Sequence, residues 1–306
     1  MAAPGRADST AADAADLATR LGARLRRIEA VGWGDAAATH RLELDDGRTV
    51  AARAIAGAGA LATAERQAAV LARLLESGLP APEPTVVPMA SQVWLVTPWV
   101  EGQTGATWLD TPERARTLAR GAGRIARDLR RVDPGGLGLD EAGATGPGNA
   151  AQARDWLRSA RPQVDRTTAA VEDAIRWLDA AVWSPSFVHG DLAPVNLIVD
   201  PDGAIVALLD VERATIGSPL ADAAWWGWVV RYHHPEAWAA SGEGFGQAAG
   251  LDPGIDGTDG RAMAALQLVG LLRAVAEAQD DETRARWLAR LDGAVGWTAG
   301  GDRQAT

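Results

Sequence analysis

Residues Phe187 to Asn196 read "FVHGDLAPVN", and this stretch constrains the fold more than any other. It places the carboxylate of Asp191 five positions before the carboxamide of Asn196, with a proline and apolar residues between them. A second segment, "AIVALLDVE", ends an apolar run at Asp210. The turn signal Pro201-Asp202-Gly203 stands between the two segments, so the pattern predicts a hairpin of strand, turn and strand.

Phosphoryl transfer from ATP needs the groups that this hairpin carries. It requires a base that orients an acceptor hydroxyl, and oxygen ligands that hold Mg²⁺ against the triphosphate. Asp191 and Asn196 provide a base and a ligand, and Asp210 adds a carboxylate of the kind that a hard Mg²⁺ ion prefers. Each residue alone is more often a cap or a turn residue. Their combination, with Glu212 close behind Asp210, indicates a phosphoryl-transfer site.

The residues from about 25 to 100 predict a small sheet with one helix. "THRLEL" and "RTVAARAI" flank Asp45-Asp46-Gly47, which is a hairpin signal. "LATAERQAAVLARLLESG" (Leu61 to Gly78) has apolar residues at helical spacing and ends in a glycine stop. "VWLVTPWVEG" predicts a buried strand that leaves into a connector. Residues 1–20 either fray or form a leading helix.

Beyond Gly102 the pattern is mostly helical. "TPERARTLARGAGRIARDLRRV" begins with a threonine cap and a proline at the first helical position, and further helical segments follow a glycine-rich loop. This order of elements predicts an α+β, protein-kinase-like two-lobe fold. The small β-rich N-lobe with one helix would span residues 21–100 and bind nucleotide. The helical C-lobe would span residues 101–306 and carry the catalytic loop and the acceptor site.

Composition excludes several classes of function. The net charge of −10 and the pI of about 4.9 argue against a nucleic-acid binder, because phosphate binding needs a basic surface. The acidic surface either keeps the protein soluble or attracts a cationic substrate. The chain has no cysteine, so it has no disulfides or thiolate metal sites. No apolar run reaches membrane-spanning length and no signal-peptide core is present, so a cytoplasmic location without membrane contact is expected.

The sequence resembles the aminoglycoside phosphotransferase family of small-molecule kinases, which share the protein-kinase-like fold. "HGDLAPVN" and "LLDVERATIGSPLADAAWW" are similar to that family's catalytic loop and metal-binding segment. "ERQAAVLARLLESGLPAPEP", "WLVTPWVEG" and "LARGAGRIARDLRRVD" are similar to its small-lobe helix, hinge and first large-lobe helix. The resemblance covers most of residues 25–300. The interior of the loop, Ala193-Pro194-Val195, departs from the family's more usual histidine and glycine.

The resemblance implies a role for each residue of these motifs. Asp191 would be the catalytic base, Asn196 and Asp210 would hold Mg²⁺, and Glu212 would support the metal site. Two further residues are expected to give structural support, namely His189, which would brace the catalytic loop, and Asp222, which would anchor it through backbone N–H groups.

The nucleotide is expected on the N-lobe. In the hinge, the carbonyl of Pro98 would accept from the adenine amino group and the N–H of Val100 would donate to the ring. Gly32 and Gly34 in "AVGWGDAAATH" would let backbone N–H groups approach the phosphates, although a plain strand-loop-strand turn is an equally good interpretation.

One departure from the family pattern concerns the lysine that kinases usually place on the third strand. All 30 basic residues of this chain are arginines. The matching position is Arg53, with Glu65 on the following helix as its expected partner. Arginine keeps the positive charge but differs from lysine in shape. A non-catalytic nucleotide-binding regulator therefore stays open as an alternative to an enzyme.

Two features suggest where the acceptor would bind. "EAQDDE" puts Glu277, Asp280 and Asp281 at a helix end, where they either hold ammonium groups or form a solvated acidic end. "WWGWVVRYHH" offers Trp226 and Tyr232 to a sugar or a cation, with core packing as the other interpretation. The expected activity is an ATP- and Mg²⁺-dependent transfer of the γ-phosphoryl group to a hydroxyl of a small polar molecule. Aminoglycosides, other antibiotics, aminosugars and amino alcohols are the candidate acceptors, and the sequence does not indicate an oligomeric state.

Overall fold

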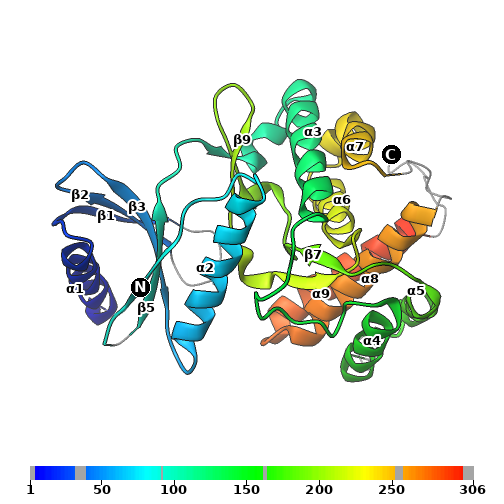
Figure 1. The fold of residues 1–306 in the computed structure, drawn as a ribbon. Coiled ribbons are helices and arrows are strands. Elements are labelled where there is room, and N and C mark those ends of the chain that lie inside the picture. The colour runs from blue at the N-terminus through cyan, green and yellow to red at the C-terminus, as the bar shows by residue number, and fades with distance from the viewer. Residues whose placement is uncertain (1–3, 32–38, 91, 161–163, 252–257, 299–306) are drawn as a thin grey trace. The chain divides into compact units, whose positions relative to one another are not determined.

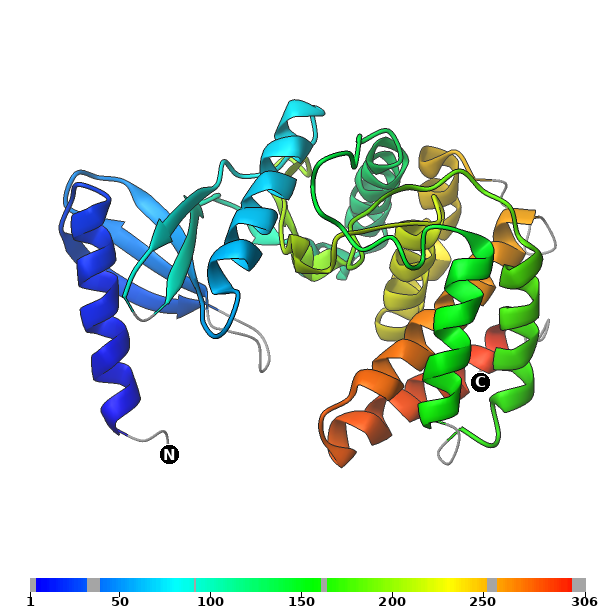
Figure 2. The same cartoon turned by 60° about the horizontal axis from the view of Figure 1, so that its bottom comes forward.

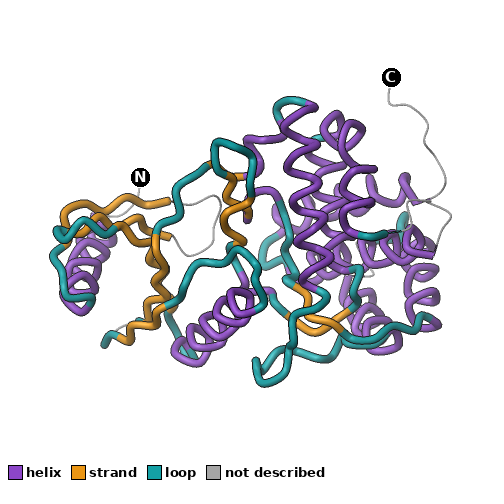
Figure 3. Tube along the Cα trace, turned by 45° about the horizontal axis from the view of Figure 1, so that its top comes forward, coloured by secondary structure: helices purple, strands orange, loops and turns teal. Residues whose placement is uncertain are grey.

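The computed structural model describes residues 4–31, 39–90, 92–160, 164–251 and 258–298. The chain divides into two compact units. Unit 1 comprises residues 1–102 together with Val206–Leu209, and unit 2 comprises residues 103–205 and 210–306. Unit 1 contains the main sheet and unit 2 is mostly helical (Figure 3), which confirms the predicted α+β fold. No helix in the described residues is long and apolar enough to cross a membrane.

Unit 1 is an antiparallel sheet with a helix on each face (Figures 1 and 2). The strand order is β1-β2-β3-β5-β4. The elements are α1 (Pro4–Arg20), β1 (Leu25–Val31), β2 (Thr39–Leu44), β3 (Thr49–Ile55), α2 (Ala60–Glu76), β4 (Thr85–Pro88) and β5 (Val93–Pro98). The predicted hairpin around Asp45-Asp46-Gly47 joins β2 to β3, with Leu42 opposite Val50.

The leading segment forms a helix because the sheet offers it an apolar face. Leu42 and Leu44 of β2 alternate with partly exposed residues, so their side chains point to one side of the sheet. The side chain of Leu17 on α1 is fully buried in the same cluster. On the other face, α2 buries residues at helical spacing, including Val70 and Leu74.

Unit 2 begins after Gly102 and is built around helices. They are α3 (Pro112–Leu129), α4 (Gly146–Ala160), α5 (Thr168–Ala180), α6 (Ala221–His233), α7 (Pro235–Ala249), α8 (Thr258–Glu277) and α9 (Asp281–Thr298), preceded by the 3-10 turn η1 (Gly105–Leu109). Its short strands and turns are β6 (Gln103–Thr104), β7 (Ser186–Val188), η2 (Pro194–Asn196), β8 (Leu197–Val199), η3 (Val211–Arg213) and β10 (Thr215–Gly217). Strand β9 (Ile205–Leu208) follows β8 in the chain, and its residues from Val206 onward belong to unit 1. A cluster of apolar side chains from α4, α5, α6, α8 and α9 forms the core of this unit.

Helix α3 shows how the local sequence sets an element that supports the site. Thr111 caps it, because its hydroxyl accepts a hydrogen bond from the N–H of Arg114 at 3.3 Å, and Pro112 occupies the first turn. The helix then packs closely on α7 through Gly123, where a Cβ would lie 2.5 Å from the carbonyl oxygen of Phe245. The predicted cap and first-position proline are therefore confirmed.

Candidate active site

The loop from His189 to Asn196, called the 189–196 loop below, joins β7 to β8. Strand β7 pairs antiparallel with β10, and all three of its residues are buried. The side chain of Leu192 is fully buried, whereas Asp191 is partly exposed. The apolar residues of the loop therefore fasten it to unit 2 and leave the carboxylate of Asp191 accessible to solvent.

Asp222, at the start of α6, holds the backbone of this loop. Its Oδ2 accepts from the N–H of His189 and its Oδ1 from the N–H of Gly190, both at 2.9 Å. The Asp222 carboxyl is only 5 % exposed, and burial raises its pKa, while His189 and the two backbone N–H groups oppose that rise. His189 is fully buried, and its Nδ1 lies 3.3 Å from the N–H of Asp191. The carboxylate and the histidine thus hold three consecutive backbone N–H groups.

Gly190 allows the loop to pass close to another segment. Its φ is 82°, in the left-handed region that favours glycine. A Cβ at this position would run into the carbonyl oxygen of Arg213. Both the backbone conformation and the available space therefore require glycine immediately before Asp191.

Asn196 orients the carboxylate of Asp191. Its Nδ2 donates to the backbone carbonyl of Asp191 at 2.8 Å and to Oδ2 of Asp191 at 3.1 Å. The hydrogen-bond network assigns the amide in this orientation, because both acceptors face the nitrogen. Oδ1 of Asn196 therefore points away from Asp191 and is the atom that can coordinate a cation.

Trp225, which lies in the aromatic stretch that the sequence offers to a sugar or a cation, makes a second contact to the same carboxylate, and the sequence did not predict this contact. Its indole Nε1 donates to Oδ1 of Asp191 at 2.7 Å. Residues three apart on a helix lie on the same face, so Trp225 lies on the side of α6 from which Asp222 reaches the loop. Because the sequence already predicts that Asp222 anchors the loop, the three-residue spacing between Asp222 and Trp225 could have predicted that Trp225 also lies near the loop.

Asp210 follows β9 and has an unusual backbone. With φ 61° and ψ 69°, it is the only non-glycine residue with positive φ in the part of the chain that the structure describes. A non-glycine residue in this conformation costs about 1–3 kcal/mol, and such strain is concentrated at functional sites. Glu212 lies two positions on, in η3, with an exposed side chain.

The candidate metal site is judged from the side chains that could donate oxygen ligands to a metal ion. Within the described residues, no three His, Asp or Glu side chains cluster to hold a metal ion by themselves. A site made from the Asn196 carboxamide and the Asp210 carboxylate agrees with this finding, because Mg²⁺ usually takes one or two protein carboxylates and keeps several waters. The donor types present fit a magnesium ion.

In unit 1, Arg53 lies on β3, opposite Thr39 of β2 and Leu95 of β5. Glu65 is exposed on α2, and Gln67, only 3 % exposed, is the buried polar residue of that helix among the described residues. The expected partnership between Arg53 and Glu65 stays a prediction.

The hinge has the backbone pattern that adenine recognition needs. The N–H of Trp99 donates to the carbonyl of Thr49 at 3.0 Å, which makes these two residues a hydrogen-bonded pair of the sheet. The adjacent pair of Val50 and Pro98 is then non-hydrogen-bonded, so the Pro98 carbonyl points away from β3. Val100 follows at the end of this segment. Gly32 and Gly34 lie outside the described residues.

The residues suggested for the acceptor are placed differently. Glu277 accepts from Arg273 at 2.8 Å, and Asp281 pairs with Arg284 at 2.6 Å. The Oδ1 of Asp280 accepts from the N–H of Thr283 at 2.7 Å at the start of α9, and this hydrogen bond lowers the pKa of the Asp280 carboxyl. These carboxylates therefore stabilise their own helices.

The two aromatic residues also have partners within unit 2. Trp226 is 1 % exposed and stacks on Phe245 at 5.5 Å, so it is a core residue and does not reach a dissolved acceptor. Tyr232 is 36 % exposed, stacks on Trp228 at 5.4 Å and has the Arg290 guanidinium 5.8 Å from its ring. A guanidinium of the chain itself already lies at the Tyr232 ring, which argues against a second cation there.

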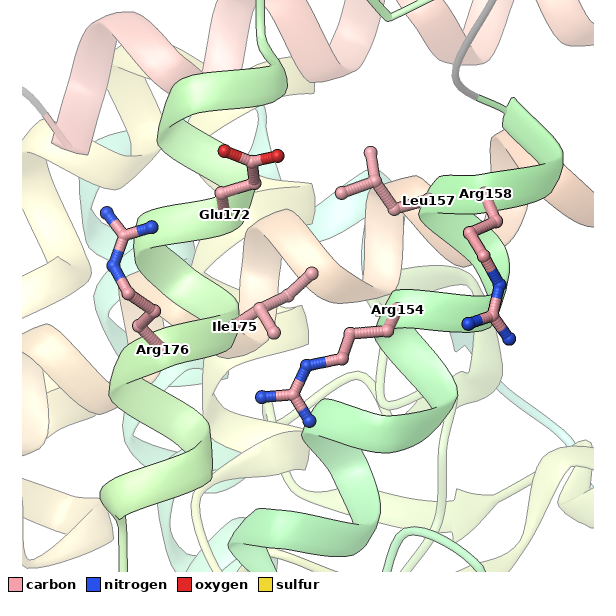
Figure 4. A pocket seen from close by; sticks show the side chains of 6 residues that line it. All are labelled: Arg154, Leu157, Arg158, Glu172, Ile175 and Arg176. Atoms are coloured by element: carbon pink, nitrogen blue, oxygen red, sulfur yellow. The ribbon is translucent and has the colours of Figure 1, made fainter.

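A pocket of about 340 Å³ between α4 and α5 is separate from the 189–196 loop (Figure 4). It is lined by Arg154, Leu157, Arg158, Glu172, Ile175 and Arg176. Each arginine has a carboxylate partner, as Arg154 pairs with Asp179, Arg158 with Asp155 and Arg176 with Asp173. The positive charge is therefore neutralised, and the pocket has no feature that would select an anion.

Comparison with solved structures shows the same fold in phosphotransferases. The macrolide 2′-phosphotransferase type I has a TM-score of 0.69 at 20 % identity, with 95 % of this chain and 99 % of that chain covered. A complex of the aminoglycoside phosphotransferase APH(4)-Ia with AMP-PNP and hygromycin B has a TM-score of 0.73 at 17 % identity, covering 93 % and 98 %. The macrolide 2′-phosphotransferase MphH of Brachybacterium faecium has a TM-score of 0.67 at 19 % identity, covering 92 % and 97 %. At these identities the likeness concerns the fold.

A sequence relative and a family model complete the comparison. Acyl-CoA dehydrogenase family member 10 of Mus musculus is 28 % identical over 174 residues, which cover 53 % of this chain. The match spans only 16 % of the mouse protein. Residues 27–266 match the model of the phosphotransferase enzyme family, APH, and this range includes most of β1, the hinge, the 189–196 loop and Asp210. The chain therefore belongs to the phosphotransferase enzyme family.

Proposed function

We propose that this protein transfers the γ-phosphoryl group of ATP to a hydroxyl of a small polar molecule. The observation that carries the proposal is the position of Asp191, whose two carboxylate oxygens accept hydrogen bonds from Asn196 and Trp225 while the loop backbone is tied to Asp222. Among the described residues, Asp191 is partly exposed, accepts from neutral donors and has no cationic partner, and a carboxylate in this setting suits a base for an incoming hydroxyl.

The chemistry assigned to Asp191 is proton acceptance. The acceptor hydroxyl donates to Asp191, which turns the hydroxyl oxygen toward the γ-phosphorus. Asp191 takes the proton as the new P–O bond forms, while the bond between the γ-phosphorus and the β–γ bridging oxygen breaks and ADP leaves. In phosphoryl transfer most of the catalysis comes from positioning and electrostatics, so the fixed orientation of the carboxylate matters as much as its basicity. The hydrogen bond that Asn196 donates to Asp191 and those that Asp222 accepts from the loop backbone supply that orientation before substrate arrives.

Asn196 and Asp210 are the residues that would hold Mg²⁺. The ion supplies positive charge at the phosphate oxygens, where negative charge is concentrated during transfer. Glu212 is close enough in sequence to support Asp210. On the N-lobe, the Pro98 carbonyl and the Val100 N–H would receive adenine, and Arg53 would face the phosphates. The neighbour complexed with AMP-PNP supports ATP as the donor.

The acceptor class proposed is an antibiotic-like or aminosugar alcohol. One structural neighbour is complexed with hygromycin B, and others are macrolide 2′-phosphotransferases, so both amino-cyclitol and macrolide alcohols belong in the first panel. The self-paired carboxylates around residues 277–281 give no support to an ammonium site there. The net charge of −10 still favours neutral or cationic acceptors over anionic ones.

An ADP-release assay tests the proposal. Purified protein with ATP and Mg²⁺ is screened against aminoglycosides, macrolides, aminosugars and amino alcohols, with Asp191→Asn as the matched blank. We expect acceptor-dependent ADP release in the wild type alone, and its loss when EDTA removes the metal. Nucleotide binding by calorimetry verifies that both proteins are folded. Equal release by both proteins on every acceptor, with ATP still bound, would contradict the proposal.

A second candidate is a nucleotide-binding regulator without catalysis. It is favoured by the arginine at position 53, where kinases usually place a lysine. Arg53→Lys separates the two candidates. An enzyme with an adequate arginine turns over in both forms and one limited by arginine improves with lysine, whereas a regulator binds ATP and turns over in neither.

A further inference from the structure

We propose that Trp225 is a positioning residue for Asp191, an inference that rests on the proposed function. Its indole Nε1 lies 2.7 Å from Oδ1 of Asp191, and Nδ2 of Asn196 lies 3.1 Å from Oδ2. One donor on each oxygen fixes the plane of the carboxylate. A carboxylate offers about four lone-pair sites, so positions remain on both oxygens for the acceptor hydroxyl.

The indole is itself held firmly. Its ring lies 4.9 Å from the ring of Trp228 on the same helix and 6.5 Å from that of Trp287 on α9. On α8, Gly270 faces the ring, since a Cβ added there would lie 3.7 Å from Cζ3 of Trp225. Contacts from α6, α8 and α9 thus limit the rotation of the indole and keep its N–H directed at Asp191.

A single helix therefore sets both parts of the catalytic group. Asp222 in the first turn of α6 fixes the backbone before Asp191, and Trp225 in the next turn fixes the side chain of Asp191. The side-chain placement needed for proton acceptance is sensitive to shifts of about 1 Å. Coupling both contacts to one rigid element keeps the carboxylate and its loop in register.

Trp225→Phe tests the proposal when its kinetics are compared with those of the wild-type protein on the best acceptor from the screen. It removes the N–H and keeps an aromatic ring. We expect kcat to fall by about 10- to 100-fold while KM for ATP stays constant. The matched control is Trp108→Phe. Trp108 is buried in unit 2, and its Nε1 has no hydrogen-bond partner in the described residues, so its loss should leave kcat within about 2-fold.

A second measurement does not depend on turnover. The indole N–H resonance of Trp225 is identified in a proton–nitrogen NMR spectrum by its loss in Trp225→Phe. We expect it to shift in Asp191→Asn, unlike the resonance of Trp108. A Trp225 resonance that does not shift in Asp191→Asn would overturn the inference. So would a Trp225→Phe enzyme with wild-type kcat.

The two proposals can fail separately. If the wild type turns over no acceptor while the Trp225 resonance still follows Asp191, the proposed function fails, and with it the catalytic meaning of the contact. If the wild type is active and Trp225→Phe loses activity only in proportion to its lower melting temperature, the proposed function stands and the positioning role is overturned.

Discussion

The 189–196 loop and the helix ends near residues 277–282 carry the same kind of side chain and use it differently. Near 277–282, Glu277 and Asp281 face arginines of their own helices. At the 189–196 loop, Asp191 accepts from amide and indole N–H groups, and Asp222 of α6 accepts from backbone N–H groups of the loop. An arginine partner cancels a negative charge, whereas a neutral donor orients a carboxylate and leaves its charge available. The type of donor, and not the density of carboxylates, distinguishes the two regions.

The largest effect is expected from Asp191→Asn, because it removes the carboxylate that is oriented by neutral donors. Asparagine keeps the size of the side chain and can still accept from one neighbour, but it cannot take a proton at neutral pH. We expect kcat to fall by about 10²–10⁴-fold, the range for loss of a general base. The measurement is initial-rate kinetics on the best acceptor. Asp281→Asn serves as the control, and an equal loss in that variant would erase the distinction between the two regions.

Asp222→Ala is expected to have the next largest effect, on stability as well as on activity. It leaves the buried N–H groups of His189 and Gly190 without their acceptor. Each unsatisfied group costs about 1–3 kcal/mol, so the free energy of unfolding should fall by about 2–5 kcal/mol. Urea unfolding followed by circular dichroism measures this change. A loss below about 0.5 kcal/mol would show that water replaces the carboxylate and that the loop does not depend on Asp222.

The pH dependence of stability refines this prediction. Burial raises the pKa of Asp222 above its ordinary value of 3.8, so the native protein binds this proton at a pH where the unfolded chain has released it. The contribution of Asp222 to the free energy of unfolding is therefore largest below the unfolded value and declines as pH rises through the native value. The difference in unfolding free energy between the wild type and Asp222→Asn should shrink over that window. A difference that grows with pH would mean that the N–H groups outweigh burial.

Gly190→Ala is expected to cost about 1–3 kcal/mol of stability, through its positive φ and the approach of Arg213. Gly246→Ala is the matched substitution, since Gly246 lies within α7 and a Cβ there meets nothing within 4 Å. Alanine should stabilise that helix by about 0.5–1 kcal/mol. Thermal unfolding measures whether each variant is less or more stable than the wild type. A Gly190→Ala protein as stable as the wild type would show that the loop can move away from residue 213.

The smallest effects belong to the helix ends near residues 277–282. Glu277→Gln and Asp281→Asn each remove one exposed ion pair, which is worth about 0.3–0.5 kcal/mol at most. We expect unchanged acceptor KM and a slight change in melting temperature. A tenfold rise in KM for a cationic acceptor would instead restore these carboxylates as an acceptor site.

The local patterns of the sequence were sufficient for the fold and for part of the site. The β2–β3 hairpin and the cap of α3 depend on a few adjacent residues, so turn and cap signals predicted them. The spacing of Asp191 and Asn196 likewise fits one short loop whose two side chains are in contact. These features need no knowledge of distant segments.

The rest depends on tertiary packing. Trp225 reaches Asp191 only because α6 lies beside the loop, and no adjacent residue signals that. The exposure of Glu65 could be predicted, since Ala64, Gln67, Val70 and Leu74 share one helical face and Glu65 falls outside it. The pairing of Glu277 and Asp281 with arginines of the same helices also follows the spacing rule for helix neighbours, once the helix boundaries are known.

The left-handed backbone at Asp210 has a consequence for evolution and engineering. A selection for stability alone would favour glycine at position 210, because glycine adopts the left-handed conformation without strain and lowers the energy of the native state. The same exchange would remove the carboxylate proposed to hold magnesium. The presence of aspartate at position 210 therefore indicates selection for activity over stability. We expect Asp210→Gly to be more stable than the wild type and inactive.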